Sequence, residues 1–217
     1  MCVAIMASKF KSFVESLANP KGPGPATTFS MFHIFYALEL MAAKPIGRNK
    51  LSAKLNVGEG AIRTIISRLR DASLIITSKE GSTLTDKGVS LWENFAEVFP
   101  KRTEIEKTAL TTSKYNYAFL VKNKAHKVKS GIDQRDAAIM GGARRALVIV
   151  FKKGRLMIES VSNSLEETFP KTANEILENL EPEDNDVVII AGADDLLKAK
   201  RGAFAASWVL LEGDKKT

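Results

Sequence analysis

The chain contains little cysteine and no long apolar run. Its single cysteine, Cys2, excludes an internal disulfide framework and a cysteine-rich zinc site. No stretch approaches the roughly 18 apolar residues of a membrane-spanning helix, and the short apolar start lacks the basic region of a secretion signal. We therefore expect a cytoplasmic protein with no membrane partner.

Residues typical of catalytic and cofactor sites are also scarce. His33 and His126 stand apart from other metal ligands, and His33 lies among aromatic residues typical of a core. The adjacent carboxylates Asp194 and Asp195 would point about 100° apart on a helix, which disfavours a catalytic pair. The chain lacks both glycine-rich phosphate-binding patterns, GxxxxGK[ST] and GxGxxG. We expect no catalytic site, no metal and no cofactor.

Positive charge is abundant and unevenly distributed. The formal charge is +7, and residues 44–79 hold eight Lys or Arg against Glu59 and Asp71, which leaves +6 in that segment. The rest of the chain is therefore almost neutral. A basic segment suits an anionic partner such as nucleic acid.

The length of 217 residues leaves room for two modest domains. Apolar periodicity and turn residues predict, in the first half, helices over 8–18, 29–43, 50–55, 58–73 and 86–99, with strands over 74–77 and 83–85. The second half alternates strands over 115–121, 146–151, 156–160 and 186–191 with helices over 134–140, 172–180 and 194–211. The predicted divisions are an N-terminal helix and Pro/Gly-rich arm over 1–28, a helical domain with a hairpin over 29–100, and an α/β domain over 101–217.

The segment 51–75 has the pattern of a helix-turn-helix, which needs two helices at a tight turn and a second helix with one free face. At 100° per residue, an apolar stripe on the second helix is formed by Ile62, Ile65, Ile66 and Leu69. Gly60, Thr64 and Ser67 lie opposite, flanked by arginines. The outer face is therefore small, polar and basic.

Small, hydroxyl and arginine side chains together suit the DNA major groove. Base contacts are predicted for Arg63, Thr64, Ser67 and Arg68. Phosphate contacts are predicted for the cations around them, Arg48, Lys50, Lys54, Arg70 and, at the hairpin tip, Lys79. The alternative is that these cations form only a solvated helix face.

The pattern LxxKLNVxxxxIRTIISRLRxxxLI, over residues 51–75, and LTDKG, over 84–88, resemble the winged-helix regulators of bacteria and archaea. Two residues depart from that family: Gly58 stands where Ser or Thr usually caps the helix, and Ser73 replaces a common glycine. As a whole the chain is similar to an archaeal family of predicted regulators with a C-terminal domain of unknown function. The resemblance implies an α+β protein, a winged-helix domain followed by an α/β domain, that regulates transcription.

Two places in the second half are candidates for a small-molecule effector. Asp133, Arg135 and Asp136 lie at a predicted helix start, where backbone N–H groups bind anions. Asp194 and Asp195 follow a predicted buried strand, and ligands of open α/β sheets bind beyond strand ends. The alternative is structural, because acidic residues commonly cap helices.

These patterns favour a regulator that binds duplex DNA and whose second domain senses a metabolite or mediates self-association. Paired half-sites on DNA predict a homodimer. Its candidate contacts are Trp92, Phe95, Phe99 and the 8–18 helix, unless these residues belong to the core. One competing hypothesis is an enzyme that acts on a phosphorylated or nucleotide-like substrate and uses the winged helix as an accessory. Another is a module that binds protein or RNA.

Overall fold

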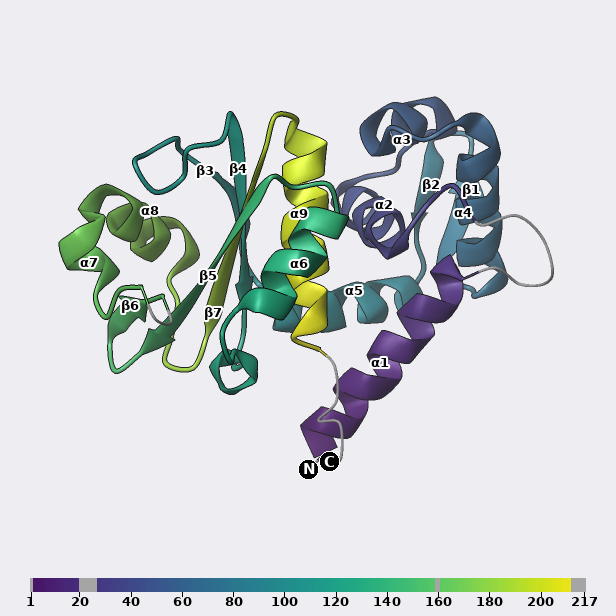
Figure 1. Ribbon diagram of the computed structural model, residues 1–217. Coiled ribbons are helices and arrows are strands. Elements are labelled where there is room, and N and C mark those ends of the chain that lie inside the picture. Colours follow the sequence, from purple (N-terminus) through teal and green to yellow (C-terminus); the bar gives the residue numbers. More distant parts are fainter. Residues whose placement is uncertain (1, 20–26, 159–160, 212–217) are drawn as a thin grey trace. The chain divides into compact units, whose positions relative to one another are not determined.

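The computed structural model describes residues 2–19, 27–158 and 161–211, and it divides into two compact units, residues 1–95 and 96–217 (Figure 1). The predicted Pro/Gly-rich arm, at residues 20–25, lies outside the described residues. The division falls within a helix, after Phe95, whereas the sequence predicted a boundary at Pro100.

Unit 1 has the predicted order of helices and one hairpin. Its elements are α1 (Cys2–Ala18), α2 (Met31–Ala43), α3 (Arg48–Leu55), α4 (Glu59–Asp71), β1 (Ile75–Ser78), β2 (Gly81–Leu84) and most of α5 (Asp86–Val98). The strands β1 and β2 pair antiparallel, Ile75 opposite Leu84. Apolar spacing predicted the order of these helices, but α1 begins at Cys2 rather than at residue 8, and α3 at Arg48 rather than at residue 50.

An aromatic cluster joins three helices of unit 1. Phe95 of α5 packs edge-to-face on Phe10 of α1, with ring centroids 4.6 Å apart, and on Phe35 of α2 at 5.1 Å. Trp92 also packs on Phe35, at 5.6 Å. Phe95 is fully buried, so this side chain belongs to the core. The helix α1 is thus a part of unit 1, not a separate arm.

This packing corrects the predicted dimer contacts. Phe95 lies in the unit 1 core, and Phe99 is fully buried in unit 2 against Phe119, with ring centroids 5.7 Å apart. Aromatic residues at helical spacing pack within one chain when that chain supplies a partner for each ring. Neither phenylalanine offers a surface to a second subunit.

The residues 84–88, LTDKG, fix the start of α5 against the end of α4. The Thr85 hydroxyl donates to the Ser73 carbonyl (2.7 Å) and accepts from the Gly88 N–H (3.1 Å), as a helix N-cap does. A Cβ on Gly88 would lie 2.0 Å from the Leu74 carbonyl oxygen. The motif is therefore structural: it allows α5 to cross the backbone before β1.

Unit 2 contains a five-stranded sheet of order β3-β4-β7-β5-β6. Its elements are β3 (Arg102–Ile105), β4 (Tyr115–Val121), a 3₁₀ turn η1 (Ala125–Lys127), α6 (Ile132–Met140), β5 (Arg145–Lys152), β6 (Arg155–Met157), α7 (Leu165–Thr168), α8 (Pro170–Leu180), β7 (Val187–Ala193) and α9 (Leu196–Val209). The sequence predicted the longer elements. It missed β3 and α7, which have only four residues each.

The sheet has helices on both faces, α6 and α9 on one and α7 and α8 on the other (Figure 1). The core on the second face includes Leu120, Ile149, Leu165, Ile176 and Ile190. All strand pairs are antiparallel, so unit 2 is α+β rather than a parallel α/β sheet. The rule that ligands bind beyond parallel strand ends therefore gives no support to the site predicted after β7.

Among the described residues, no helix combines the length and apolar character needed to cross a membrane.

Candidate nucleic-acid interface

The helices α3 and α4 meet at a tight turn. Leu51 and Leu55 anchor α3 in the core, and α3 ends at Asn56, whose φ of 51° and ψ of 47° place it in the left-handed region. The Ser52 hydroxyl donates to the Val57 carbonyl at 2.6 Å, which ties the turn back to α3. Because asparagine tolerates this backbone conformation, the chain can reverse within a few residues.

The helix α4 has two contrasting sides. Ile62, Ile65 and Leu69 are buried at 1% exposure or less, whereas Arg63 and Thr64 are exposed. Gly58 is the N-cap of α4, as its place in the family pattern indicated. It lacks the hydroxyl group with which Ser or Thr would accept a hydrogen bond from the first turn. The burial of the apolar stripe fixes the outward direction of the polar side.

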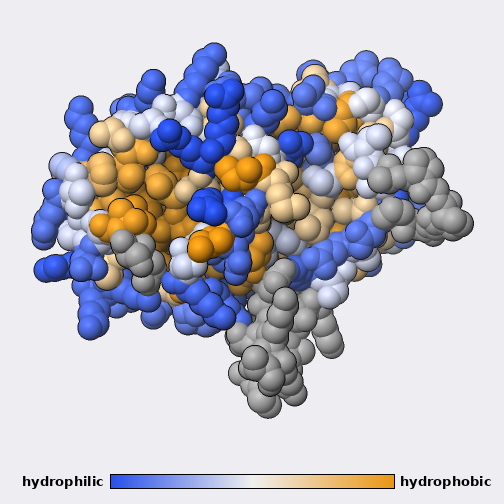
Figure 2. Space-filling view, viewed as in Figure 1, coloured by the Kyte–Doolittle hydropathy of each residue, from blue (hydrophilic) through white to orange (hydrophobic). Residues whose placement is uncertain are grey.

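The exposed side of α3, α4 and the hairpin is basic. The exposed cations on these elements are Arg48, Lys50, Lys54, Arg63, Arg70 and, in the turn between β1 and β2, Lys79. Ser67 is half-buried beside them. We call these residues with Thr64 and Gly60 the α3–α4 surface. In Figure 2, hydrophilic side chains lie along the upper right edge of this unit, with apolar and intermediate ones beside them.

An exposed ion pair lies on the α3–α4 surface. Arg63 Nη2 is 3.1 Å from Glu59 Oε2, one helical turn away, and the side chains are 68% and 76% exposed. Such an exposed pair is worth about 1 kcal/mol or less, so it yields readily to a stronger anion. The two residues also border a hollow of about 190 Å³ with Arg48, Asn49 and Ser52.

Arg68 does not lie on this surface, which corrects its predicted role in base contact. It is 7% exposed, and its Nη1 donates to the carbonyls of Leu17 (2.8 Å) and Asn19 (2.7 Å). Its guanidinium carbon lies 5.1 Å from the centre of the Phe29 ring. A cation suits the C-terminal carbonyls of a helix, here those of α1. Arg68 therefore clamps α1 to α4.

The acidic residues predicted to bind an effector at the start of α6 are exposed. Asp133 lies in the first turn, and Arg135 Nη2 is 3.0 Å from Asp136 Oδ1. These residues are on one helix turn, as predicted. Arg135 borders a hollow that also reaches Gly192 at the end of β7. Of the predicted ligand residues, Arg135 borders this hollow, whereas the four aspartates do not.

The second predicted pair, after β7, has structural partners. Asp194 pairs with Arg144, and Asp195 Oδ1 accepts a hydrogen bond from the Lys198 N–H at 3.0 Å. Asp195 is therefore the N-cap of α9. Asp195 therefore has a structural role as a helix cap. Arg144, the partner of Asp194, is a cation that borders the hollow next to Arg135.

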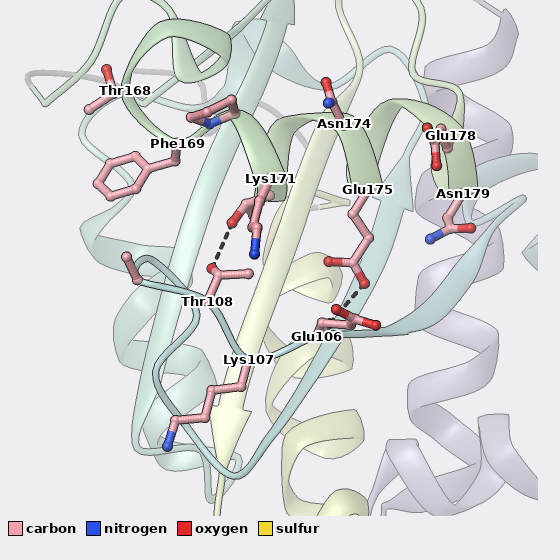
Figure 3. A pocket seen from close by; sticks show the side chains of 13 residues that line it. Glu106, Lys107, Thr108, Thr168, Phe169, Lys171, Asn174, Glu175, Glu178 and Asn179 are labelled. Atoms are coloured by element: carbon pink, nitrogen blue, oxygen red, sulfur yellow. Dashed lines mark hydrogen bonds between the residues drawn. The ribbon is translucent and has the colours of Figure 1, made fainter.

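A larger hollow of about 870 Å³ lies between residues 106–109 and α8 (Figure 3). The Glu106 N–H donates to Glu175 Oε1 at 2.8 Å, and the hydroxyls of Thr108 and Thr172 are 2.7 Å apart. Burial raises the pKa of Glu175 above its usual value, although the hydrogen bond opposes this. Sequence reasoning missed this hollow because its two walls are about 60 residues apart in the chain.

His33 has a structural role. It is 7% exposed, and its Nδ1 accepts from the Ser30 N–H at 2.9 Å, at the start of α2. Within residues 2–19, 27–158 and 161–211, no three His, Cys, Asp or Glu side chains come close enough to hold a metal ion.

Two family models match parts of the chain. Residues 34–90 match the N-terminal domain of PH0730-like proteins, and residues 112–210 match a domain of unknown function, DUF4443. The chain is also similar to a solved structure, the hypothetical protein PH0730 from the archaeon Pyrococcus horikoshii OT3. That likeness has 27% identity and a TM-score of 0.69, and it covers 84% of this chain and 92% of the other. Among curated proteins, none matches the chain. Both units therefore have an archaeal counterpart, and no activity comes with it.

Proposed function

We propose that this protein regulates transcription by binding double-stranded DNA through a winged-helix domain formed by unit 1. The observation that carries the proposal is the two-sided α4. Its apolar side is buried, and its outward side presents Gly60, Arg63 and Thr64 beside the cations of α3. A helix with a small, polar and basic outer face fits the major groove, because the backbone can approach the base edges.

The proposed roles follow from position. Arg63, Thr64 and Ser67 face the bases. The cations of α3 and the α4 end, Arg48, Lys50, Lys54 and Arg70, contact phosphates. Thr64 Oγ1 donates to the Gly60 carbonyl at 3.0 Å, so its oxygen is left to accept from a base amino group. Lys79 would contact the backbone or minor groove beside the site.

The hairpin supports the winged-helix interpretation. Ile46, before α3, exchanges two hydrogen bonds with Ser82 of β2, at 3.0 and 2.9 Å, and so forms an antiparallel bridge beside the two-stranded hairpin. Gly81, with φ of 130°, allows the approach, because a Cβ there would lie 2.5 Å from the Ile46 carbonyl carbon. The hairpin and this bridge together connect the Lys79 turn to the segment before α3.

The proposal includes a homodimer in the cytoplasm, since paired half-sites match a two-fold protein, and an effector bound by unit 2. The alternatives are an enzyme with an accessory winged helix and a module that binds protein or RNA. The RNA alternative has its own outcome in the test below.

The test measures binding of the purified protein to genomic DNA fragments, including its own upstream region, across a salt series. The variant Lys50→Ala/Arg63→Ala should bind at least about tenfold more weakly, with the salt slope reduced by about 2. The matched control, Lys129→Ala/Lys198→Ala, removes the same charge from exposed positions of unit 2 and should bind as the parent does. Equal binding by both variants would contradict the α3–α4 assignment.

A second variant tests the ion pair. Glu59→Gln removes the partner of Arg63 and one negative charge, so DNA affinity should rise about threefold. Retention of single-stranded RNA in preference to duplex DNA, with the same dependence on Arg63, would replace the DNA proposal with the RNA-binding alternative.

A further inference from the structure

A hollow of about 310 Å³ lies in unit 2 where β5 begins and β7 ends. It is bordered by residues 110–113, by α6, and by the paired positions Arg145 and Gly192. Among its lining residues are three arginines, Arg135, Arg144 and Arg145, and none is Asp or Glu. Four separate chain segments thus gather positive charge in one concave place.

The three arginines make exposed ion pairs or a hydrogen bond to a neutral group. Arg135 and Arg144 pair with Asp136 and Asp194, and in each pair both side chains are more than half exposed. Exposed pairs contribute little to stability, because solvent screens them. Arg145 Nη1 instead donates to a neutral oxygen, Thr112 Oγ1, at 2.6 Å. An entering dianion can therefore draw on all three guanidinium groups.

The wall of residues 111–113 is held in a defined shape. Asn116, 4% exposed, donates from Nδ2 to the carbonyls of Thr111 and Ser113, both at 3.2 Å. Opposite, a Cβ on Gly192 would lie 2.4 Å from Ser113 Oγ, so only glycine lets this wall approach β7. The hydroxyls of Thr112 and Ser113 are consequently positioned at the hollow as additional hydrogen-bonding groups.

The other side of the hollow is apolar. Ile139, which is 43% exposed, borders it together with Leu147 and Ile190. A second groove of about 200 Å³ shares Arg135 and Leu147 with it and continues over apolar side chains, Val128, Ile132, Val148, Ile158 and Val161. Figure 2 shows apolar side chains on the face of unit 2 where β5 and α6 lie. A ligand that fits both parts has a charged head and an apolar body.

We propose that this hollow binds a small phosphorylated metabolite, with its phosphate among Arg135, Arg144 and Arg145 and its apolar part toward Ile139 and the adjoining groove. Arginine forks match the geometry of phosphate oxygens, and hydroxyl groups complete the set of donors. The hollow of Figure 3 is larger but is lined by carboxylates as well as lysines, so it lacks this selectivity for anions. The site does not depend on the DNA-binding proposal.

The experiment is calorimetric titration of the whole protein with phenyl phosphate, inorganic phosphate and phenol, with amide NMR shifts to locate binding. Phenyl phosphate should bind more tightly than inorganic phosphate, phenol should not bind, and the amides of Ser113 and Gly192 should shift. Arg144→Gln/Arg145→Gln should weaken phenyl phosphate at least about tenfold. The control Arg155→Gln/Lys198→Gln, at exposed positions outside the hollow, should not.

A second variant controls for the possibility that the arginine variant loses binding because it does not fold. Ile139→Glu places a carboxylate at a half-exposed position on the rim, so the fold should persist while phenyl phosphate binding falls. Unchanged affinity in both variants, or shifts confined to other residues, would overturn the proposal. A third outcome would also overturn it: phenyl phosphate does not bind, but a short oligonucleotide does, and both variants lose the oligonucleotide. The hollow would then recognise the phosphates of nucleic acid.

Discussion

The two basic regions of this molecule differ in how the chain makes them. The α3–α4 surface is built from one short stretch, residues 48–79, whose cations point outward because the apolar stripe of α4 is buried. The arginine hollow of unit 2 joins four segments, and its cations surround a concave place. Cations spread along exposed helices suit a long polyanion, and cations around a concave place suit a small anion.

The largest expected effect is a loss of stability that is confined to unit 1. Gly88→Ala would place a Cβ 2.0 Å from the Leu74 carbonyl oxygen, so unit 1 should lose about 3 kcal/mol or more of stability and, with it, DNA binding. Phenyl phosphate binding by unit 2 should survive. Chemical denaturation followed by tryptophan fluorescence, which reports Trp92 of unit 1 and Trp208 of unit 2, checks this beside both binding assays.

The control for Gly88→Ala is Gly60→Ala, because a Cβ at Gly60 meets no atom within 4 Å. This variant should be as stable as the parent or more so. A Gly88→Ala protein as stable as the parent would show that α5 can move away from β1, and loss of both binding activities together would show that the two regions are not separable.

A middle-sized effect distinguishes two arginines of α4. Arg68→Ala removes two hydrogen bonds, to the buried Leu17 carbonyl and the part-buried Asn19 carbonyl, and should cost about 2 kcal/mol of unfolding free energy. Arg63→Ala removes only an exposed ion pair and should change stability by about 0.5 kcal/mol or less. Urea unfolding measures the first difference, and DNA titration should show that Arg63→Ala is the variant with the direct binding defect. An Arg68→Ala variant of full stability that failed to bind DNA would restore Arg68 to the interface.

The smallest effect concerns the support of the α3–α4 surface. Ser73, after α4, has φ of 59°, a conformation that glycine adopts without strain. Ser73→Gly should therefore raise stability by about 1 kcal/mol and leave phosphate binding in unit 2 unchanged. Ser90→Gly, at an exposed position inside α5, should instead lower stability by a similar amount. Thermal unfolding compares the pair, and a destabilised Ser73→Gly protein would contradict the strain argument.

The same contrast explains what could be predicted from the sequence. The helices α2 to α5 and the hairpin follow from local apolar spacing, and both unusual positions, Gly58 and Ser73, were identified by comparison with a family pattern. Arg68 was assigned wrongly because it flanks the small, polar face of α4 on one side, as Arg63 does on the other. Only the return of α1 to that flank, a contact between residues about 50 apart, decides between exposure and burial.

Long-range assembly also limited the predictions for unit 2. Arg135 was identified as part of a ligand site, but Arg144 and Arg145 were not, because their meeting depends on the antiparallel pairing of β5 with β7. That pairing sets Arg145 opposite Gly192, and nothing in the local sequence of either strand specifies it. Charge pattern alone could not find a site whose parts become neighbours only in the folded sheet.

The contact made by Arg68 constrains the sequence of α4 more than the sequence of α1. The contact needs one particular side chain on α4, but on α1 it uses main-chain oxygens, which every residue type supplies. Exchange of the exposed Asn19 for another residue keeps an acceptor in place, whereas exchange of Arg68 removes the donor. Mutation can therefore accumulate at the end of α1 while the guanidinium group that holds it stays fixed.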